Sequence, residues 1–101
     1  GACYIAKNGT YMNSGNPASA GSKTGAIITW TAGSVSGFLP SVSVYGASTS
    51  SGSFSAVSMN FGSPSFAISS GNQDGNGYGN MEYAVPSGYY SLNTKNLAEY
   101  G

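Results

Sequence analysis

The segment FSAVSMNF, residues 54–61, gives the clearest secondary-structure signal in the chain. Val57, Met59 and Phe61 occupy alternate positions in it, with a serine and an asparagine between them. Because successive side chains of a strand point to opposite faces of a sheet, this alternation predicts a strand with one apolar face and one polar face. We therefore expect this strand to cover an apolar layer on one side only.

Shorter segments on both sides repeat the pattern. We expect further strands over residues 26–31, 38–45, 66–68, 81–85 and 90–92, separated by turns and polar loops. The pair Asn8-Gly9 predicts a tight hairpin because both residue types tolerate positive φ, and Pro86-Ser87-Gly88 predicts a turn. Helical periodicity is absent from longer segments, and only residues 95–100 are expected to form a helical turn.

The composition favours a small all-β domain, an antiparallel β-sandwich formed by residues 1–101. Gly, Ser and Asn supply 44 of the 101 residues, which suits brief strands joined by polar loops. An aromatic content of 13% and a net charge of zero separate the chain from typical disordered proteins. A domain this small buries little surface and is only marginally stable alone, and a net charge of zero gives little repulsion between copies. We therefore expect it to be a subunit of a larger assembly. The predicted core is Ile28, Trp30, Val42, Val44, Val57, Met59, Phe61 and Tyr90.

Several classes of protein are disfavoured by what the sequence lacks. Three lysines and no arginine cannot build the basic face of a nucleic-acid-binding protein. An apolar run of the length needed for a membrane span is missing, and Cys3 has no second cysteine to pair with. The chain has no histidine and only three acids, so nucleophilic and paired-carboxylate catalysis lack their usual groups. We expect no enzymatic activity, no cofactor and no nucleic-acid partner.

The glycine- and asparagine-rich loop over residues 71–80 resembles the start of a calcium-binding loop. Asn72, Asp74 and Asn76 alternate and a glycine follows, as in the first half of an EF-hand loop. The acidic ligand expected at the twelfth position is missing, because Tyr83 stands there. The sequence therefore favours an irregular or hairpin-like surface loop with no metal site, and weak Ca²⁺ binding is the alternative.

The same region is a candidate for surface recognition. Tyrosine, asparagine, serine and glycine make adaptable, uncharged contacts, and they are concentrated here. The candidate ligand-binding residues, for a sugar or a protein, are Asn72, Asp74, Asn76, Tyr78 and Tyr89. The competing interpretation is that the tyrosines on strands pack against the sheet and that Tyr78 packs across its own loop.

Four motifs resemble those of one known family. YIAKNGT at residues 4–10 is similar to the Y/F-x-x-K-N-G hairpin of SPRY domains. FLPSV at 38–42 and SMNFG at 58–62 resemble two later strands of that family. YAVPSGYYSLNTKNL at 83–97 is similar to the ending of SPRY-like domains in tailed-phage structural proteins. The motifs occur in the family's order, and the last of them is the most specific.

The resemblance implies a concanavalin-like sandwich of two sheets and a non-enzymatic role in a virion. The expected protein is a tail-fibre, tail-associated or capsid-decorating component, assembled in the host cytoplasm. Its expected partners are other virion subunits or copies of itself. Two alternatives stay open: a module that binds a host glycan or receptor, and a microbial filament or adhesion protein that is secreted or held at the cell surface.

Two departures from the family pattern bear on these expectations. Val85 stands where the phage pattern often has a proline. In addition, the lysine-asparagine-glycine hairpin normally lies well inside the domain, so the chain resembles only the later half of a SPRY domain. Three interpretations follow: a cleaved piece, the ordered part of a longer protein, or a subunit whose incomplete sandwich is completed by neighbouring chains.

Overall fold

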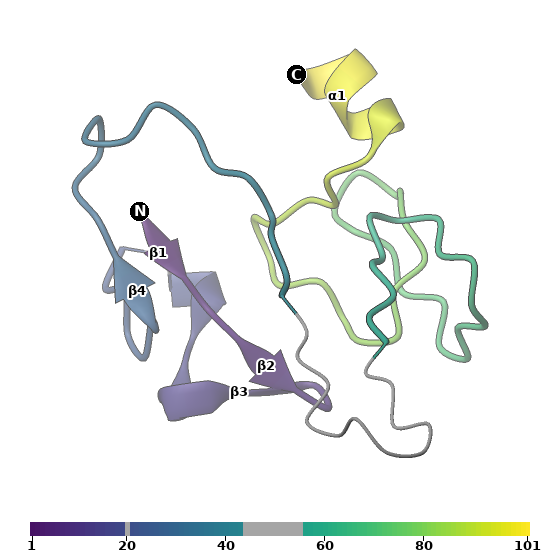
Figure 1. Ribbon diagram of the computed structural model, residues 1–101, viewed down its shortest axis with the longest axis horizontal. Helices are drawn as coiled ribbons and strands as arrows, with labels where there is room; N and C mark the ends of the chain where they lie inside the picture. Colours follow the sequence, from purple (N-terminus) through teal and green to yellow (C-terminus); the bar gives the residue numbers. More distant parts are fainter. Residues whose placement is uncertain (20, 44–55) are drawn as a thin grey trace, which may run out of the picture.

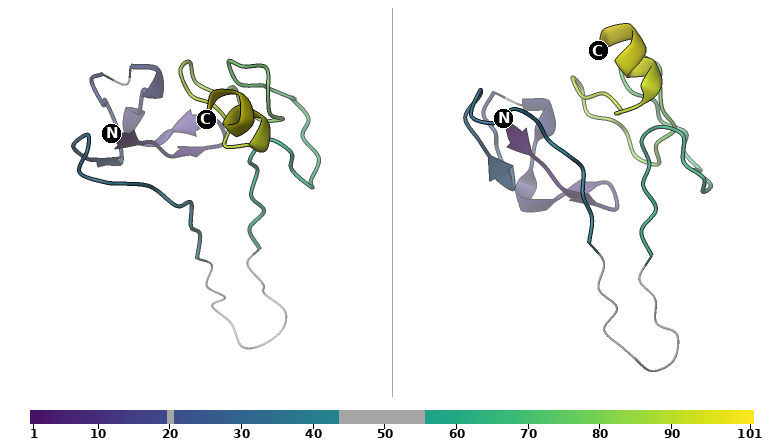
Figure 2. Two further views of the ribbon diagram at one scale, coloured as in Figure 1. Left: turned by 90° about the horizontal axis from the view of Figure 1, so that it is seen from above. Right: turned by 45° about the horizontal axis from the view of Figure 1, so that its top comes forward.

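The computed structural model describes residues 1–19, 21–43 and 56–101. In Figure 1 the four strands all belong to the N-terminal part, whereas the helix follows a long series of turns and loops on the other side of the molecule. Figure 2 shows the same separation in two further views. The elements are β1 (Ala2–Cys3), β2 (Ala6–Lys7), β3 (Thr10–Tyr11), the 3₁₀ turns η1 (Met12–Ser14) and η2 (Pro17–Ser19), β4 (Ile28–Thr29) and α1 (Thr94–Tyr100).

The predicted hairpin at Asn8-Gly9 is confirmed. Strands β2 and β3 are antiparallel, with Lys7 opposite Thr10. Asn8 has φ 50° and Gly9 has φ 78°, so both central residues are left-handed. This is the arrangement of a type I′ turn, whose twist matches that of the flanking strands.

Gly9 is the residue on which this turn depends most. A β-carbon at Gly9 would be strained at its positive φ and would lie 2.7 Å from Cδ1 of Tyr83. We expect Gly9→Ala to weaken the hairpin by about 1–2 kcal/mol, the usual cost of left-handed backbone for an L-residue. Amide hydrogen exchange of Met12, whose N–H bonds the Ile5 carbonyl at 2.8 Å, would measure this.

Gly21 provides the matched control for that variant. An added β-carbon at Gly21 would meet no atom within 4 Å. We expect Gly21→Ala to leave the exchange rate of Met12 unchanged. Equal acceleration in the two variants would show that the effect does not originate in the turn.

The second strand pair joins the beginning of the chain to residues 27–30. Strands β1 and β4 are antiparallel, with Ala2 opposite Thr29 and Cys3 opposite Ile28. The amide of Trp30 extends the pairing by donating to the Gly1 carbonyl at 3.0 Å. The strand expected over residues 26–31 is therefore present in its central part.

Local signals near the C-terminus are also confirmed. The amide of Tyr89 donates to the Pro86 carbonyl at 3.0 Å, and Gly88 has φ 83°, so the predicted turn is formed. The expected helical turn is the seven-residue α1, which starts one residue earlier than predicted. Within the described ranges no helix has the length and apolarity needed to cross a membrane.

The other expected strands are not formed. Residues 38–43, 56–61, 66–68 and 90–92 belong to no strand. Of the segment 81–85 only Met81 pairs, in a single antiparallel bridge with Asn72. Residues 44–45 and 54–55, which complete two of these predictions, lie outside the described residues. The physical reason is that alternation specifies a strand only where a neighbouring strand and an apolar layer are present to receive it.

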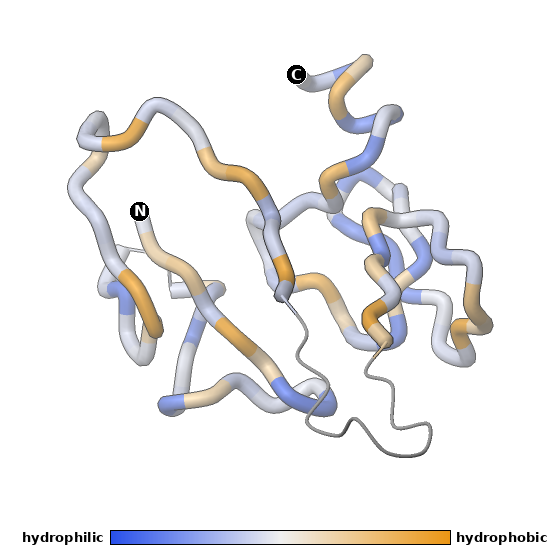
Figure 3. The backbone as a smooth tube through the Cα atoms, viewed as in Figure 1, coloured by the Kyte–Doolittle hydropathy of each residue, from blue (hydrophilic) through white to orange (hydrophobic). Residues whose placement is uncertain are grey.

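The predicted core is wrong for this chain by itself. Ile28, Val42, Val57, Met59, Phe61 and Tyr90 are between 42% and 60% exposed, because the described residues supply no second layer to cover them. Trp30 is half-buried beside Phe38, with ring centroids 4.5 Å apart, and Val44 lies outside the described residues. Figure 3 shows apolar residues spread along the whole trace. The two-sheet sandwich stays a prediction, now for the chain joined by its neighbours.

Candidate functional site

The loop over residues 72–81 is closed at its base by backbone hydrogen bonds. Asn72 and Met81 exchange both of their N–H···O bonds at 2.8 Å. Further in, the amide of Asp74 donates to the carbonyl of Tyr78 at 2.9 Å, and the amide of Gly77 donates to the carbonyl of Asp74 at 2.9 Å. Residues 74–78 therefore form a tight turn, in which Gly77 takes the left-handed conformation with φ 78°.

The Asp74 carboxylate points into this turn and beyond it. Its Oδ1 accepts hydrogen bonds from the amides of Asn76 at 3.0 Å and Tyr78 at 3.1 Å. Its Oδ2 accepts from the Ser91 amide at 2.9 Å and the Ser91 hydroxyl at 2.5 Å. A fifth bond comes from Nδ2 of Asn96 at 2.8 Å. The carboxylate thus fastens the loop to the segment that leads into α1.

The start of α1 is built around the same contacts. Asn93 is the N-cap, and its side chain accepts from the amide of Asn96 at 2.8 Å, which satisfies a free N–H of the first helical turn. Nδ2 of Asn93 donates to the Ser91 hydroxyl at 2.6 Å. We call Asp74, Ser91, Asn93 and Asn96 the Asp74 cluster.

Three members of the Asp74 cluster are the buried polar residues of the described ranges, in which no large apolar side chain is buried. Asp74, Ser91 and Asn96 are only 7–9% exposed. The donors to the carboxylate are all neutral: backbone amides, one hydroxyl and one side-chain amide. The Ser91 hydroxyl, followed by these other donors, holds the pKa of Asp74 far below its ordinary range, against the opposing effect of burial. Asp74 is therefore ionised at neutral pH.

The other two acids of the chain are also hydrogen-bonded within it. Glu82 accepts from the Ser69 amide at 2.8 Å, from the Ser69 hydroxyl, and from the Ser70 hydroxyl at 3.2 Å. The Ser69 hydroxyl is the main reason that the pKa of Glu82 is lowered. Glu99 accepts from the hydroxyl of Tyr78, and this bond raises the pKa of that tyrosine. Each carboxylate thus holds two segments of the chain together.

Four of the five sequence-predicted site residues meet in this region. Asp74 is at its centre, and Nδ2 of Asn76 donates to Oδ1 of Asn96 at 2.8 Å. Nδ2 of Asn72 donates to the carbonyl of Glu82 at 3.0 Å, closing the loop base. The ring of Tyr78 lies 5.4 Å from the ammonium nitrogen of Lys95.

Asn72, Asp74, Asn76 and Tyr78 therefore all make side-chain hydrogen bonds within the chain. Both oxygens of Asp74 face N–H and O–H donors, so their lone pairs are directed at hydrogens. In the described ranges no group of three His, Cys, Asp or Glu residues gathers as a metal site would require. Asn72, Asp74 and Asn76 therefore stabilise the loop and hold it against the segment that leads into α1.

The fifth predicted residue, Tyr89, lies apart from the others. It lines an apolar groove of about 590 Å³ that joins the N-terminal strands to the segments 38–40 and 86–92. Leu39, which is 91% exposed, lines this groove and a second depression of about 560 Å³ that also contains Met59 and Phe61. The other lining residues of the groove are Ala2, Cys3, Tyr4, Tyr11, Pro17, Ile28, Trp30, Phe38, Pro40, Pro86 and Leu92.

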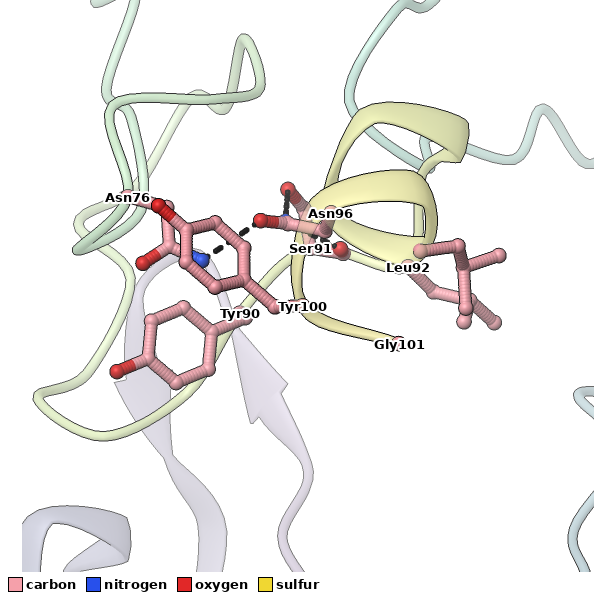
Figure 4. A pocket seen from close by; sticks show the side chains of 8 residues that line it. Asn76, Tyr90, Ser91, Leu92, Asn96, Tyr100 and Gly101 are labelled. Atoms are coloured by element: carbon pink, nitrogen blue, oxygen red, sulfur yellow. Dashed lines mark hydrogen bonds between the residues drawn. The ribbon is translucent and has the colours of Figure 1, made fainter.

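A separate pocket lies beside the Asp74 cluster, and sequence reasoning missed it. Its cavity of about 530 Å³ is bordered by the rings of Tyr90 and Tyr100 and by the side chain of Asn76 (Figure 4). Leu92 and Leu97 add apolar surface. The sequence offered no signal for it, because one tyrosine was expected in a sheet and the other in a helical turn. We call it the Tyr90–Tyr100 pocket.

Comparison with protein-family models, with curated proteins and with solved structures found no match to the chain. The SPRY-like resemblance therefore rests on the four sequence motifs alone. Three features distinguish the molecule. They are the buried Asp74 cluster, whose carboxylate is hydrogen-bonded within the chain, the exposed apolar groove, and the Tyr90–Tyr100 pocket.

Proposed function

We propose that the chain is a non-enzymatic structural subunit of a phage virion, in a tail fibre, a tail-associated part or a capsid decoration. It completes its apolar layers with other virion subunits or with copies of itself. The observation that carries this proposal is that none of the large apolar side chains in the described residues is buried. The motif at 83–97, which resembles the ending of SPRY-like domains in tailed-phage structural proteins, supports the virion setting.

The exposed apolar side chains support the need for a partner. Leu39 is 91% and Phe38 is 66% exposed, and both line the apolar groove. Permanent subunit interfaces bury about 2000 Å² or more, and they resemble a protein core cut in half. The apolar groove and the adjoining depression supply a surface of this character.

Leu39→Ser tests whether the apolar groove is the assembly surface. Because Leu39 is 91% exposed, this change should leave the isolated chain's fold unaffected. In the assembly the serine hydroxyl would be buried in an apolar contact without a hydrogen-bond partner. We therefore expect association to weaken by about 2 kcal/mol, a roughly thirtyfold rise in the dissociation constant. Sedimentation equilibrium or light scattering over a concentration series would measure the change in oligomer population.

Val35→Ser is the matched control for this test. Val35 is also exposed and aliphatic, but it lines neither apolar depression. We expect it to associate as the parent does. A parent that stays monomeric at high concentration, both alone and with the other virion subunits, would refute assembly, and equal losses in the two variants would refute the groove as its location.

The virion setting is tested by where the chain is found. Mass spectrometry of purified virions should detect it in stoichiometric amounts. Recovery from the surface fraction or medium of uninfected cells, with none in virions, would instead support the microbial filament or adhesion protein. The alternative of host-glycan binding is favoured by a separate observation, the Tyr90–Tyr100 pocket.

A further inference from the structure

We infer that the Tyr90–Tyr100 pocket binds one neutral pyranose residue of a glycan. This inference goes beyond the proposed assembly and does not depend on it, because the pocket is formed entirely within residues 76–101 and shares only Leu92 with the apolar groove. Its cavity of about 530 Å³ lies within the range of sites for small ligands.

The apolar part of the pocket suits the faces of a sugar ring. Tyr90 is 57% and Tyr100 is 62% exposed, so both rings are open to solvent at the pocket wall. One edge of the Tyr90 ring is close to Gly75, where an added β-carbon would lie 3.4 Å from Cε1. Tyrosine combines a rigid apolar ring with a hydroxyl, which matches the C–H and O–H groups of a pyranose.

The polar part is oriented by the buried carboxylate next to it. Because Oδ2 of Asp74 accepts from Asn96, the group of Asn96 that faces it must be the NH₂. Oδ1 of Asn96 is then the atom that faces Asn76, and so Asn76 must present its own NH₂ to it. Asn76 lines the pocket, and its Oδ1 keeps its capacity to accept, because no described residue donates to it; Figure 4 shows the bond made by the other end of this amide.

The hydrogen bonds from Asn76 to Asn96 and from Asn96 to Asp74 fix the orientation of both side-chain amides, while the charge stays on the buried carboxylate. An Asp74 carboxylate can only accept, so neither amide can flip without losing a hydrogen bond. A ligand hydroxyl therefore meets an acceptor whose orientation is already set, so binding adds no cost for ordering these two amides. The Asp74 cluster thus holds Asn76 in the orientation that the proposed sugar site needs.

The charge of the lining selects against acidic sugars. None of the side chains that line the pocket is a lysine, and Lys95 lies instead over the ring of Tyr78, at 5.4 Å from its centroid. An acidic sugar would lose hydration of its carboxylate and gain no cation in exchange. The pocket chemistry thus points to an uncharged hexose or N-acetylhexosamine.

The test is a titration of the full ¹⁵N-labelled chain with methyl glycosides of glucose, galactose, mannose and N-acetylglucosamine. We expect saturable shifts of the Asn76 side-chain amide and of the Ser91 and Tyr100 amides for at least one sugar, with a dissociation constant of about 1–10 mM. Tyr100→Ala and Tyr90→Ala should each weaken binding about tenfold, through loss of the stacking ring. Tyr100→Phe keeps the ring and should retain most of the affinity.

Tyr83→Ala is the matched control, since Tyr83 is 53% exposed and does not line the pocket. It should bind as the parent does. Saturation by none of the four sugars, equal affinity for N-acetylneuraminic acid, or equal losses in the Tyr83 and Tyr100 variants would each overturn the inference. Light scattering on the same samples reports assembly separately, so failure of one proposal is distinguishable from failure of the other.

Discussion

Asn96→Ala should accelerate hydrogen exchange at the amides of Tyr78 and Ser91 by about ten- to hundredfold, the range expected for losing a hydrogen bond to a charged group. Nδ2 of Asn96 donates to Asp74 at 2.8 Å and to the Ser91 carbonyl at 2.8 Å. Alanine removes both bonds and leaves the ionised carboxylate short of a donor. The measurement is native-state exchange followed by two-dimensional NMR.

The effect should spread beyond the mutated residue. Because Asn96 also accepts from Asn76 at 2.8 Å, both segments held by the cluster lose a contact at once. Asn80→Ala removes an exposed amide from the same loop and should leave these rates within about twofold of the parent, as surface substitutions usually do. Matching rates in the Asn96 variant and the parent would show that the cluster does not hold the loop to α1.

Acid should begin to loosen the Asp74 cluster below about pH 5. The pKa of Asp74 is lower in the folded chain than its ordinary value, chiefly because of the Ser91 hydroxyl. Above about pH 5 the carboxylate is almost fully ionised in both the folded and the unfolded chain, so its contribution to stability is complete. As the pH falls further, the unfolded chain is protonated first, so the contribution declines until the folded pKa is reached.

The amide chemical shifts of Asn76, Tyr78 and Ser91 report the protonation of Asp74 in the folded chain. They should be constant from pH 7 to about pH 4 and change below it. Asp74→Asn should remove the acid dependence from these amides. The separate acid dependence of the Ser69 amide, which follows from the lowered pKa of Glu82, should remain. Shifts of the cluster amides with a midpoint above pH 4 would contradict the assignment.

Features set by neighbouring residues were predictable from the sequence. The Asn8-Gly9 hairpin, the turn at residues 86–88 and the C-terminal helical turn are all present. Each depends on the conformational preferences of a few adjacent residues: positive φ for asparagine and glycine, and fixed φ for proline. These preferences act whether or not a partner chain is there.

The other expected strands are absent from the described residues, because a strand, unlike a turn, depends on contacts with residues far away in the sequence. The alternation at Val57, Met59 and Phe61 describes which side chains could share a face. Forming the strand also needs a neighbouring strand, and the described residues supply none for this segment. The exposure of this segment does not alternate, because Ser58 is exposed as well as Val57 and Met59. The sandwich stays a prediction for the proposed assembly.

The Asp74 cluster could not have been predicted from spacing. Asp74 lies 17 residues from Ser91 and 22 from Asn96, and no periodicity links them. The alternation of Asp74 with asparagines makes it a candidate ligand-binding residue, with weak Ca²⁺ binding only as the alternative. Its partners were missed because serine and asparagine in a polar chain carry no distinguishing signal.

Holding a buried anion with neutral donors has a consequence for the conditions that the fold tolerates. Dissolved ions weaken the attraction between opposite charges. The hydrogen bonds to the Asp74 carboxylate come from neutral groups and from no lysine or arginine, so added salt has no ion pair to weaken there. The joint between the loop and α1 should therefore be nearly as firm in concentrated brine as in dilute buffer, while the contacts of the apolar groove become stronger in salting-out media.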